Sequence, residues 1–401
     1  MPTLTNYNQF NGRHWETGTI HNYYAHRQIT APHTNQPYSE ALLMGISGGL
    51  VFGYFNFAYD GHDPQCNILT RNTFDPWDTL LSRLGVNQNI HHSLKTDRAI
   101  NKLTDLLDSG LPVIAWPDHW SLTYNGHENS DMWGALPIIV YGYEPDQDTV
   151  HIADRATVPL SATTTEFHTA LGRLKKYKNR LITLDPPNPD KLTTAIRLGL
   201  SDTIKLFTEK PPKGSANNFG LNAYQFWAKM LTNPKQRKSW HKFYPHGPRL
   251  YAGLTTAYEF ACLFGKNDAQ DGERTLYATF LDEAATLLNQ PRLHDAANQF
   301  RTSATLWQQL PNYLLPRDIP PFQQARDLLY QRHLTFLNHG NAGLPTIHHI
   351  NHQLNQLRQQ IETNFPLTPA QTDELKTALA DHILRLHDAE KAAITTLQQA
   401  I

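Results

Sequence analysis

The spacing of apolar residues predicts short helices and strands in the first half of the chain. Apolar runs of strand length occur at residues 50–57, 111–116, 120–124, 137–143, 149–154 and 180–184. Helical segments are predicted at residues 16–27, 39–44, 74–84, 95–109 and 163–174. Pro145, Asp146 and Asp148 separate two of the strands and favour a hairpin turn. Helices followed by hairpin strands indicate an α+β fold with an antiparallel sheet.

The second half of the chain has an almost purely helical pattern. Its clearest helices are predicted at residues 275–288, 293–310 and 368–397. One face of the first of these helices carries Leu276, Phe280, Ala284 and Leu287. Three prolines within residues 185–190 cannot continue a helix or a central strand, so they mark a boundary. We therefore predict an N-terminal domain at 1–184, a linker at 185–190 and an all-α domain at 191–401.

Composition narrows the classes of protein that this chain can belong to. Its 401 residues are 40% hydrophobic and 18% charged, which is typical of a globular protein. Lys and Arg number 35 against 36 Asp and Glu, so nothing predicts a nucleic-acid partner. The N-terminus lacks the pattern of a secretory signal, and no apolar stretch is long enough to span a membrane. With only two cysteines, the chain is predicted to be cytoplasmic, with no membrane partner.

One stretch with candidate chemistry stands at the start of a predicted helix. His14, Trp15 and Glu16 offer an imidazole, a large aromatic ring and a carboxylate side by side. The stretch is compatible with a metal-binding corner or a general-base site. A purely structural role as a helix cap is about equally favoured, because the helix dipole alone favours a glutamate in the first turn.

Other polar clusters carry weaker signals. The loops at residues 116–120 and 124–131 are polar and aromatic, which suits either binding groups or solvated loops. The glycines within 45–49 follow a helix and precede a strand, so they do not form a dinucleotide-binding motif. A histidine cluster without a carboxylate or cysteine partner is predicted to lie at the surface, and it consists of His348, His349 and His352. No metal or cofactor is predicted.

Several short motifs follow one another along the first half of the chain. They are His14-Trp15, Ser39-Glu40 before residues 45–49, the segment 110–113 running to Asp118, Gly142-Tyr143, and Asp154. In their order and spacing, these motifs resemble the amide-forming acyltransferase family of butirosin biosynthesis protein H. Residues 274–285 and 304–307 resemble the helical domain that commonly follows this family's N-terminal domain. The resemblance implies a papain-like N-terminal domain with an antiparallel sheet, followed by an all-α domain.

The chain departs from this family where the family's chemistry takes place. The resemblance puts Trp15 at the position of the cysteine nucleophile and Leu136 at that of the catalytic histidine. The third member, the acid that orients the histidine, is present as Asp154. Because thiol acyl transfer needs a thiolate beside an imidazole, the family's mechanism cannot be carried over to this chain.

Three interpretations follow from this combination. In the first, the cleft is retained and works by acid/base chemistry such as cyclisation, condensation or isomerisation. Its catalytic candidates are Glu16, Asp154, His14 and Asp118. Its substrate-binding candidates are Trp15, Glu40, His119, Tyr124 and Leu136. In the second, the protein is a pseudoenzyme that binds or scaffolds a partner. In the third, acyl transfer uses a displaced nucleophile, Cys66 or Ser39.

We prefer the first interpretation at this point, because many polar residues are predicted around the cleft. The resemblance places the protein in natural-product biosynthesis. The implied partner is a small-molecule substrate, free or tethered to a carrier protein. The helical domain is expected to cover the cleft or to form a homodimer.

Overall fold

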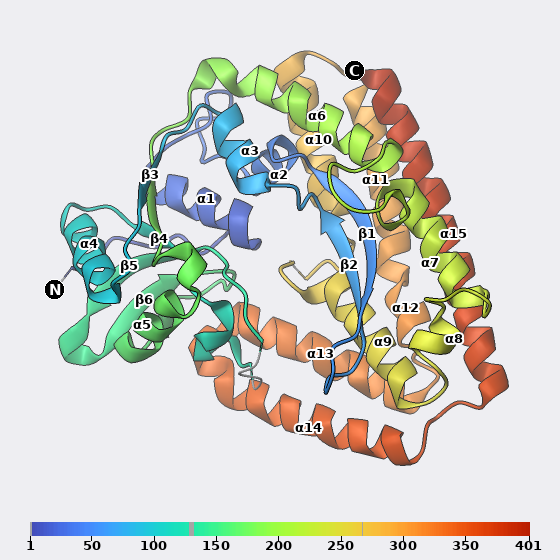
Figure 1. The fold of residues 1–401 in the computed structure, drawn as a ribbon. Helices are drawn as coiled ribbons and strands as arrows, with labels where there is room; N and C mark the ends of the chain where they lie inside the picture. Colours follow the sequence, from blue (N-terminus) through green and yellow to red (C-terminus); the bar gives the residue numbers. More distant parts are fainter. Residues whose placement is uncertain (1, 128–131, 267) are drawn as a thin grey trace. The chain divides into compact units, whose positions relative to one another are not determined.

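The fold was obtained as a computed structural model that describes residues 2–127, 132–266 and 268–401 (Figure 1). The chain packs into two compact units, each built from three separate segments. The sheet unit consists of Met1–Leu43, Trp77–Leu192 and Arg332–His349. The helical unit consists of Met44–Pro76, Thr193–Gln331 and Ile350–Ile401. The predicted domains at 1–184 and 191–401, with a linker at 185–190, are regions expected to fold independently. These boundaries stay a prediction.

The sheet unit is organised around a six-stranded antiparallel sheet. Its strands are ordered β3 (Gln88–His91), β8 (Leu181–Leu184), β4 (Val113–Ala115), β5 (Ile138–Glu144), β6 (Thr149–Ala153) and β7 (Leu160–Ala162). All five neighbouring pairs are antiparallel. The predicted hairpin is confirmed as β5 and β6, joined by the 3-10 turn Pro145–Gln147. The fold is therefore α+β with an antiparallel sheet, as the sequence indicates.

Helices cover both faces of this sheet because its central strands are apolar on both sides. Val113 and Ala115 belong to a buried core that also contains Leu103 of α4 (Thr96–Asp108) and Phe167 of α5 (Thr164–Arg173). Successive strand residues point to opposite faces, so the buried Ile114 points the other way. The helix α1 (Trp15–His26) lies on that opposite side of the sheet from α4 and α5 (Figure 1). The start of α1 is thereby held against a rigid layer.

The helical unit contains a β-hairpin packed among helices. Strands β1 (Leu50–Phe57) and β2 (Gln65–Arg71) pair antiparallel and contact α7 (Gly220–Thr232) and α9 (Pro248–Tyr258), as Figure 1 shows. The other helices that lie wholly or largely in this unit are α6 (Leu192–Thr208), α8 (Trp240–Phe243), α10 (Arg274–Leu288), α11 (Leu293–Gln309), α12 (Pro311–Leu314), α13 (Pro320–His339), α14 (Leu344–Thr363) and α15 (Pro369–Ala400). The helical character predicted for the second half of the chain is confirmed. Among the described residues, no helix is long and apolar enough to cross a membrane.

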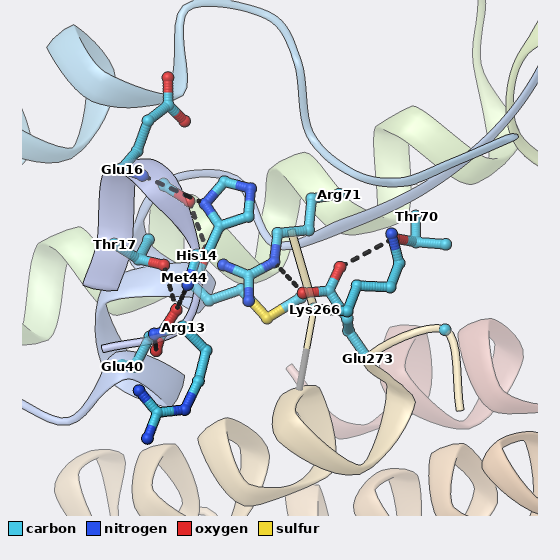
Figure 2. Close-up of polar contacts among 12 residues, drawn as sticks. Arg13, His14, Glu16, Thr17, Glu40, Met44, Thr70, Arg71, Lys266 and Glu273 are labelled. Atoms are coloured by element: carbon cyan, nitrogen blue, oxygen red, sulfur yellow. Dashed lines mark hydrogen bonds and ion pairs between the residues drawn. The ribbon is translucent and has the colours of Figure 1, made fainter. Parts of the chain in front are cut away.

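Buried charges fasten the hairpin to the helices of this unit. In Figure 2, the carboxylate of Glu273 accepts hydrogen bonds from Arg71 Nε at 2.5 Å and from Thr70 Oγ1 at 2.8 Å. Arg274, at the start of α10, forms a second buried ion pair with Glu390 of α15, with Nε and Oε1 2.8 Å apart. Buried ion pairs of this kind are costly to break once formed, because removing one partner leaves an uncompensated charge.

The structure corrects one expectation about the first half of the chain and adds three short strands. Residues 120–124 are not a strand but parts of two 3-10 turns, His119–Ser121 and Thr123–Asn125. The reason is local, since the Asp118 carboxylate accepts the Ser121 hydroxyl and bends the chain. The sequence also missed the short strands β2, β3 and β7, whose mixed composition gives little periodicity. Cys66 lies within β2. In the predicted loop at 124–131, residues 128–131 lie outside the described residues.

Candidate functional site

The start of α1 is defined by a sharp turn of the backbone. His14 is the N-cap residue, with extended backbone angles, and its Nδ1 accepts the Glu16 amide at 3.3 Å. Before it, the chain folds back onto the first turn of the helix. A Cβ on Gly18 would lie 2.7 Å from the backbone nitrogen of Arg13, so this close approach requires glycine. The amides of residues 13 and 14 are thus presented at the end of the helix.

Glu40, in the first turn of α2 (Glu40–Ile46), binds these amides. Its Oε2 accepts the Arg13 amide at 2.8 Å, and its Oε1 accepts the His14 amide at 2.9 Å and the Thr17 hydroxyl at 2.9 Å (Figure 2). A carboxylate at a helix N-terminus is favoured by the exposed amides and by the helix dipole. Glu40, predicted to bind substrate, therefore holds the helix start together. Glu16 is half-buried, and its carboxyl points away from the His14 ring in Figure 2.

Trp15 is buried, with 8% of its surface exposed, and it lies against a cation. The guanidinium carbon of Arg155 lies 5.1 Å from the centroid of the Trp15 ring. The same guanidinium lies 4.6 Å from the ring centroid of Phe336, which comes from the C-terminal half of the chain. Arginine stacked on aromatic faces at these distances is a favourable cation–π arrangement. Trp15 thus acts as one wall of an aromatic slot that holds Arg155.

Arg155 is also bound by polar groups on its edge. Its Nε and Nη2 each donate to an oxygen of Asp154 at 3.1 Å, and Nη2 donates to Asn125 Oδ1 at 2.5 Å. The remaining contact of the Asp154 carboxylate is the hydroxyl of the fully buried Tyr124, at 3.2 Å. Burial and the nearby Asp154 charge raise the pKa of Tyr124 well above its usual value. Tyr124 is therefore a neutral donor to a carboxylate that already neutralises an arginine.

The buried His119 contacts Trp15, and the half-buried His127 contacts His119. The His119 ring stands edge-on to Trp15, with centroids 6.3 Å apart, and edge-on to His127, with centroids 5.0 Å apart. His127 also stacks on Trp120 at 4.0 Å. Burial and the charge of Arg155 lower the pKa of His119 well below its usual range, and the pKa of His127 to about 4. Both imidazoles are consequently neutral near pH 7.

Asp118 and Leu136 are held in place by other parts of the sheet unit. The fully buried Asp118 carboxylate accepts the amide of Gly134 at 2.8 Å and Nη1 of Arg173 at 2.9 Å, besides the Ser121 hydroxyl at 2.6 Å. Leu136 lies just before β5, and its amide donates to the carbonyl oxygen of Pro117 at 3.4 Å. These contacts give Asp118 a structural role in the turn that carries His119.

The structure brings five of the predicted site residues into one cluster and adds others. We call it the Arg155 cluster. Arg155 contacts Trp15, Phe336, Asp154 and Asn125, and Asp154 in turn binds Tyr124. His119 contacts Trp15 and His127. His14 joins it through an edge-on contact with Trp15, with centroids 5.6 Å apart. Sequence reasoning missed Arg155, although its position directly after the predicted acid is a usable signal. No sequence signal points to Phe336, because it lies about 180 residues after Arg155 in the chain.

The metal-ligand side chains of the chain do not gather into a metal site in the part that the structure describes. No group of three or more His, Cys, Asp or Glu residues is arranged there to hold a metal ion. His348, His349 and His352 lie exposed on α14, which confirms their predicted surface position. The two cysteines are both buried and unpaired.

The antiparallel sheet with α1 against it, together with the helix-start motif, defines an α+β domain. Residues 14–155 match the family described as Butirosin biosynthesis protein H, N-terminal. The match supports the resemblance to a family like that of butirosin biosynthesis protein H, as the motifs indicate. The matched region begins at the N-cap His14 and ends at Arg155. None of the curated proteins matches the chain.

Proposed function

We propose that this protein acts in natural-product biosynthesis as a binding protein, and that its sheet unit holds a small molecule beside the start of α1 without covalent chemistry. The match of residues 14–155 to the butirosin protein H-like family supports the biosynthetic setting. The observation that carries the proposal is the ion pair of Asp154 with Arg155, whose guanidinium rests on Trp15. At the start of α1, the Glu40 carboxylate and the donors of residues 13, 14 and 17 are hydrogen-bonded to one another.

Acid/base catalysis needs a carboxyl group that can exchange a proton with the substrate. The carboxylates of Asp154, Asp118 and Glu40 accept hydrogen bonds from donors of the protein itself. Asp154 is held by Arg155 and Tyr124, Asp118 by Arg173 and its own turn, and Glu40 by the helix start. Withdrawing any of them would break interactions that maintain the fold. This arrangement favours binding over turnover.

The displaced-nucleophile interpretation has less support. Burial raises the pKa of the Cys66 thiol well above its usual value, so a reactive thiolate is disfavoured. The hydroxyl oxygen of Ser39 accepts the Leu42 amide at 3.0 Å in the first turn of α2, which is the role of a helix cap.

The proposal is tested by equilibrating the purified protein with a metabolite extract of producing cells. Native mass spectrometry after desalting identifies retained compounds, and chromatography of the extract measures consumption. We expect a compound to be retained at up to one equivalent, with no consumption beyond the amount bound. Retention should be lost in Trp15→Ala and kept in Arg249→Gln, an exposed position in the helical unit. Consumption of several equivalents of any compound by the wild-type protein contradicts the proposal.

A second candidate function is acid/base catalysis restricted to His14 and Glu16. It is favoured by the bond from the Glu16 amide to His14 Nδ1, which leaves the proton of a neutral His14 on Nε2. In this case the experiment above shows turnover. Glu16→Gln abolishes it, whereas the same change at the exposed Glu374 has no effect.

The proposal also includes the binding partner that the resemblance implies. The ligand is a small molecule, either free or tethered to a carrier protein. Repeating the retention measurement with intact carrier proteins of the producing cells distinguishes the two forms. Sedimentation of the purified protein tests the expected homodimer.

A further inference from the structure

His119 lies in the turn between β4 and β5. Its side chain is almost fully buried, with 2% of the residue exposed. Neither Nδ1 nor Nε2 has a hydrogen-bond partner within the part of the chain that the structure describes. Buried polar atoms are nearly always paired in folded proteins, because an unpaired one costs its full desolvation penalty. Among the described residues, His119 therefore has no hydrogen bond that would offset the burial of its ring nitrogens.

The half-buried His127 lies next to His119. The ring centroids are 5.0 Å apart at an interplanar angle of 67°, and Nε2 of His127 is also buried without a partner in the described residues. The two rings are enclosed by aromatic surfaces, since Trp15 stands edge-on to His119 and Trp120 stacks on His127. Three buried ring nitrogens that have no hydrogen-bond partner among the described residues thus lie beside these two tryptophan rings.

The charges nearby restrict what these nitrogens can bind. Burial and, to a lesser extent, the charge of Arg155 lower the pKa of both histidines, so each ring is neutral near pH 7 and offers one N–H donor and one lone pair. The Arg155 charge disfavours a metal cation at the lone pairs. An anion gains little from two neutral rings, and the Arg155 guanidinium is already paired with Asp154. An uncharged group that both donates and accepts hydrogen bonds fits best.

We propose that His119 and His127 form a recognition pair for an uncharged amide or hydroxyl group of a small molecule bound beside Trp15. This inference rests on the proposed function and names the ligand chemistry of the same site. The two imidazoles supply direction and specificity, and the tryptophan rings supply apolar contact area. This division of labour is common in small-molecule sites, where a few polar groups orient a ligand against apolar walls.

The experiment uses the full chain with ¹⁵N-labelled histidine at pH 7. The imidazole nitrogen resonances of His119 and His127, assigned through single variants, are followed during titration with acetamide, with sodium acetate or with zinc chloride. We expect a saturable shift of both residues with acetamide, and little change with the other two probes. His119→Phe should abolish the response of His127 to acetamide, whereas His348→Phe, at an exposed position, should leave it intact.

A stability measurement separates recognition from a structural role. If the nitrogens are kept for a ligand, His119→Phe removes unpaired polar atoms and leaves the urea midpoint unchanged or raised. A lowered midpoint together with no acetamide response overturns the inference, because His119 is then an ordinary core residue. Saturable binding of zinc in place of acetamide also overturns it. Neither result touches the proposed absence of turnover, which the metabolite experiment tests separately.

Discussion

The guanidinium of Arg155 lies 5.1 Å from the Trp15 ring centroid, at the helix start where the family resemblance places a nucleophile. Phe336 covers the same guanidinium at 4.6 Å, and Asp154 neutralises it along its edge. The charge is therefore held between two aromatic faces and a carboxylate. The Arg155 guanidinium held in this way contributes to the stability of the folded state. Substituting its neighbours one by one tests each contribution.

Truncating Trp15 should be strongly destabilising. Trp15→Ala removes a buried ring and leaves a cavity beside Arg155, so we expect a loss of about 3–5 kcal/mol in the free energy of unfolding. Trp15→Phe keeps an aromatic face and should cost clearly less. Urea denaturation followed by circular dichroism measures both. Equal effects of the two variants would contradict a role for the aromatic face.

Removing the Asp154 charge should uncover the cost of burying Arg155. Asp154→Asn keeps the size of the side chain but leaves the guanidinium without its counter-charge, at a cost of about 3 kcal/mol in stability. The exposed Asp108 at the end of α4 supplies the control, and Asp108→Asn should change stability by less than about 0.5 kcal/mol. Similar urea midpoints for the two variants would show that the ion pair contributes nothing.

Glu390 should have a comparable role in the helical unit. Its carboxylate accepts Arg274 Nε at 2.8 Å and Trp307 Nε1 at 3.1 Å, and both side chains of the ion pair are fully buried. Glu390→Gln removes the counter-charge of Arg274, and we expect a loss of about 3–5 kcal/mol. Glu374→Gln, at an exposed position of the same helix, is the control. A thermal melt with unchanged midpoint for Glu390→Gln would refute the expectation.

His382 should make stability depend on pH. Its Nε2 donates to the Leu306 carbonyl at 3.0 Å, and its Nδ1 accepts Arg385 Nη2 at 2.9 Å, so the neutral form is bound on both sides. Burial and the Arg385 charge lower the pKa of His382 from 6.5 to about 4. Between pH 6.5 and 4 the unfolded chain binds a proton that the folded chain does not, so stability falls as the pH falls through this window.

The matched variants are His382→Gln and His352→Gln. The first removes the buried imidazole and should flatten the decline of the urea midpoint between pH 6.5 and 4. The second changes an exposed position on α14 and should retain the wild-type decline. If His382→Gln declines as steeply as the wild type, the imidazole is not the group responsible.

The two thiols should be inert in the folded protein. Burial raises the pKa of Cys66 well above its usual value and that of Cys262 to about 12. We expect no reaction with Ellman's reagent in buffer and complete reaction of both thiols in urea, as only the thiolate reacts. A fast phase of one equivalent in buffer would revive the displaced-nucleophile interpretation for Cys66.

Features that depend on local periodicity can be predicted from the sequence alone. The amphipathic helix α4, the hairpin β5–β6 and the long helix α15 follow from the spacing of apolar residues and from turn chemistry within a few positions. The helix-start motif at His14 was found in the same way. These signals need no knowledge of distant segments, because the residues that form each element are neighbours in the chain.

The contacts of the candidate residues could not be predicted from the sequence and are known from the tertiary structure. Glu40 binds amides of residues 13 and 14, Asp154 pairs with Arg155, and Phe336 of the C-terminal half packs on Arg155 in the sheet unit. Each of these contacts depends on how segments far apart in sequence pack. Apolar patterning fixes which face of an element is buried, but not which distant side chain meets it, because burial of apolar surface is non-directional.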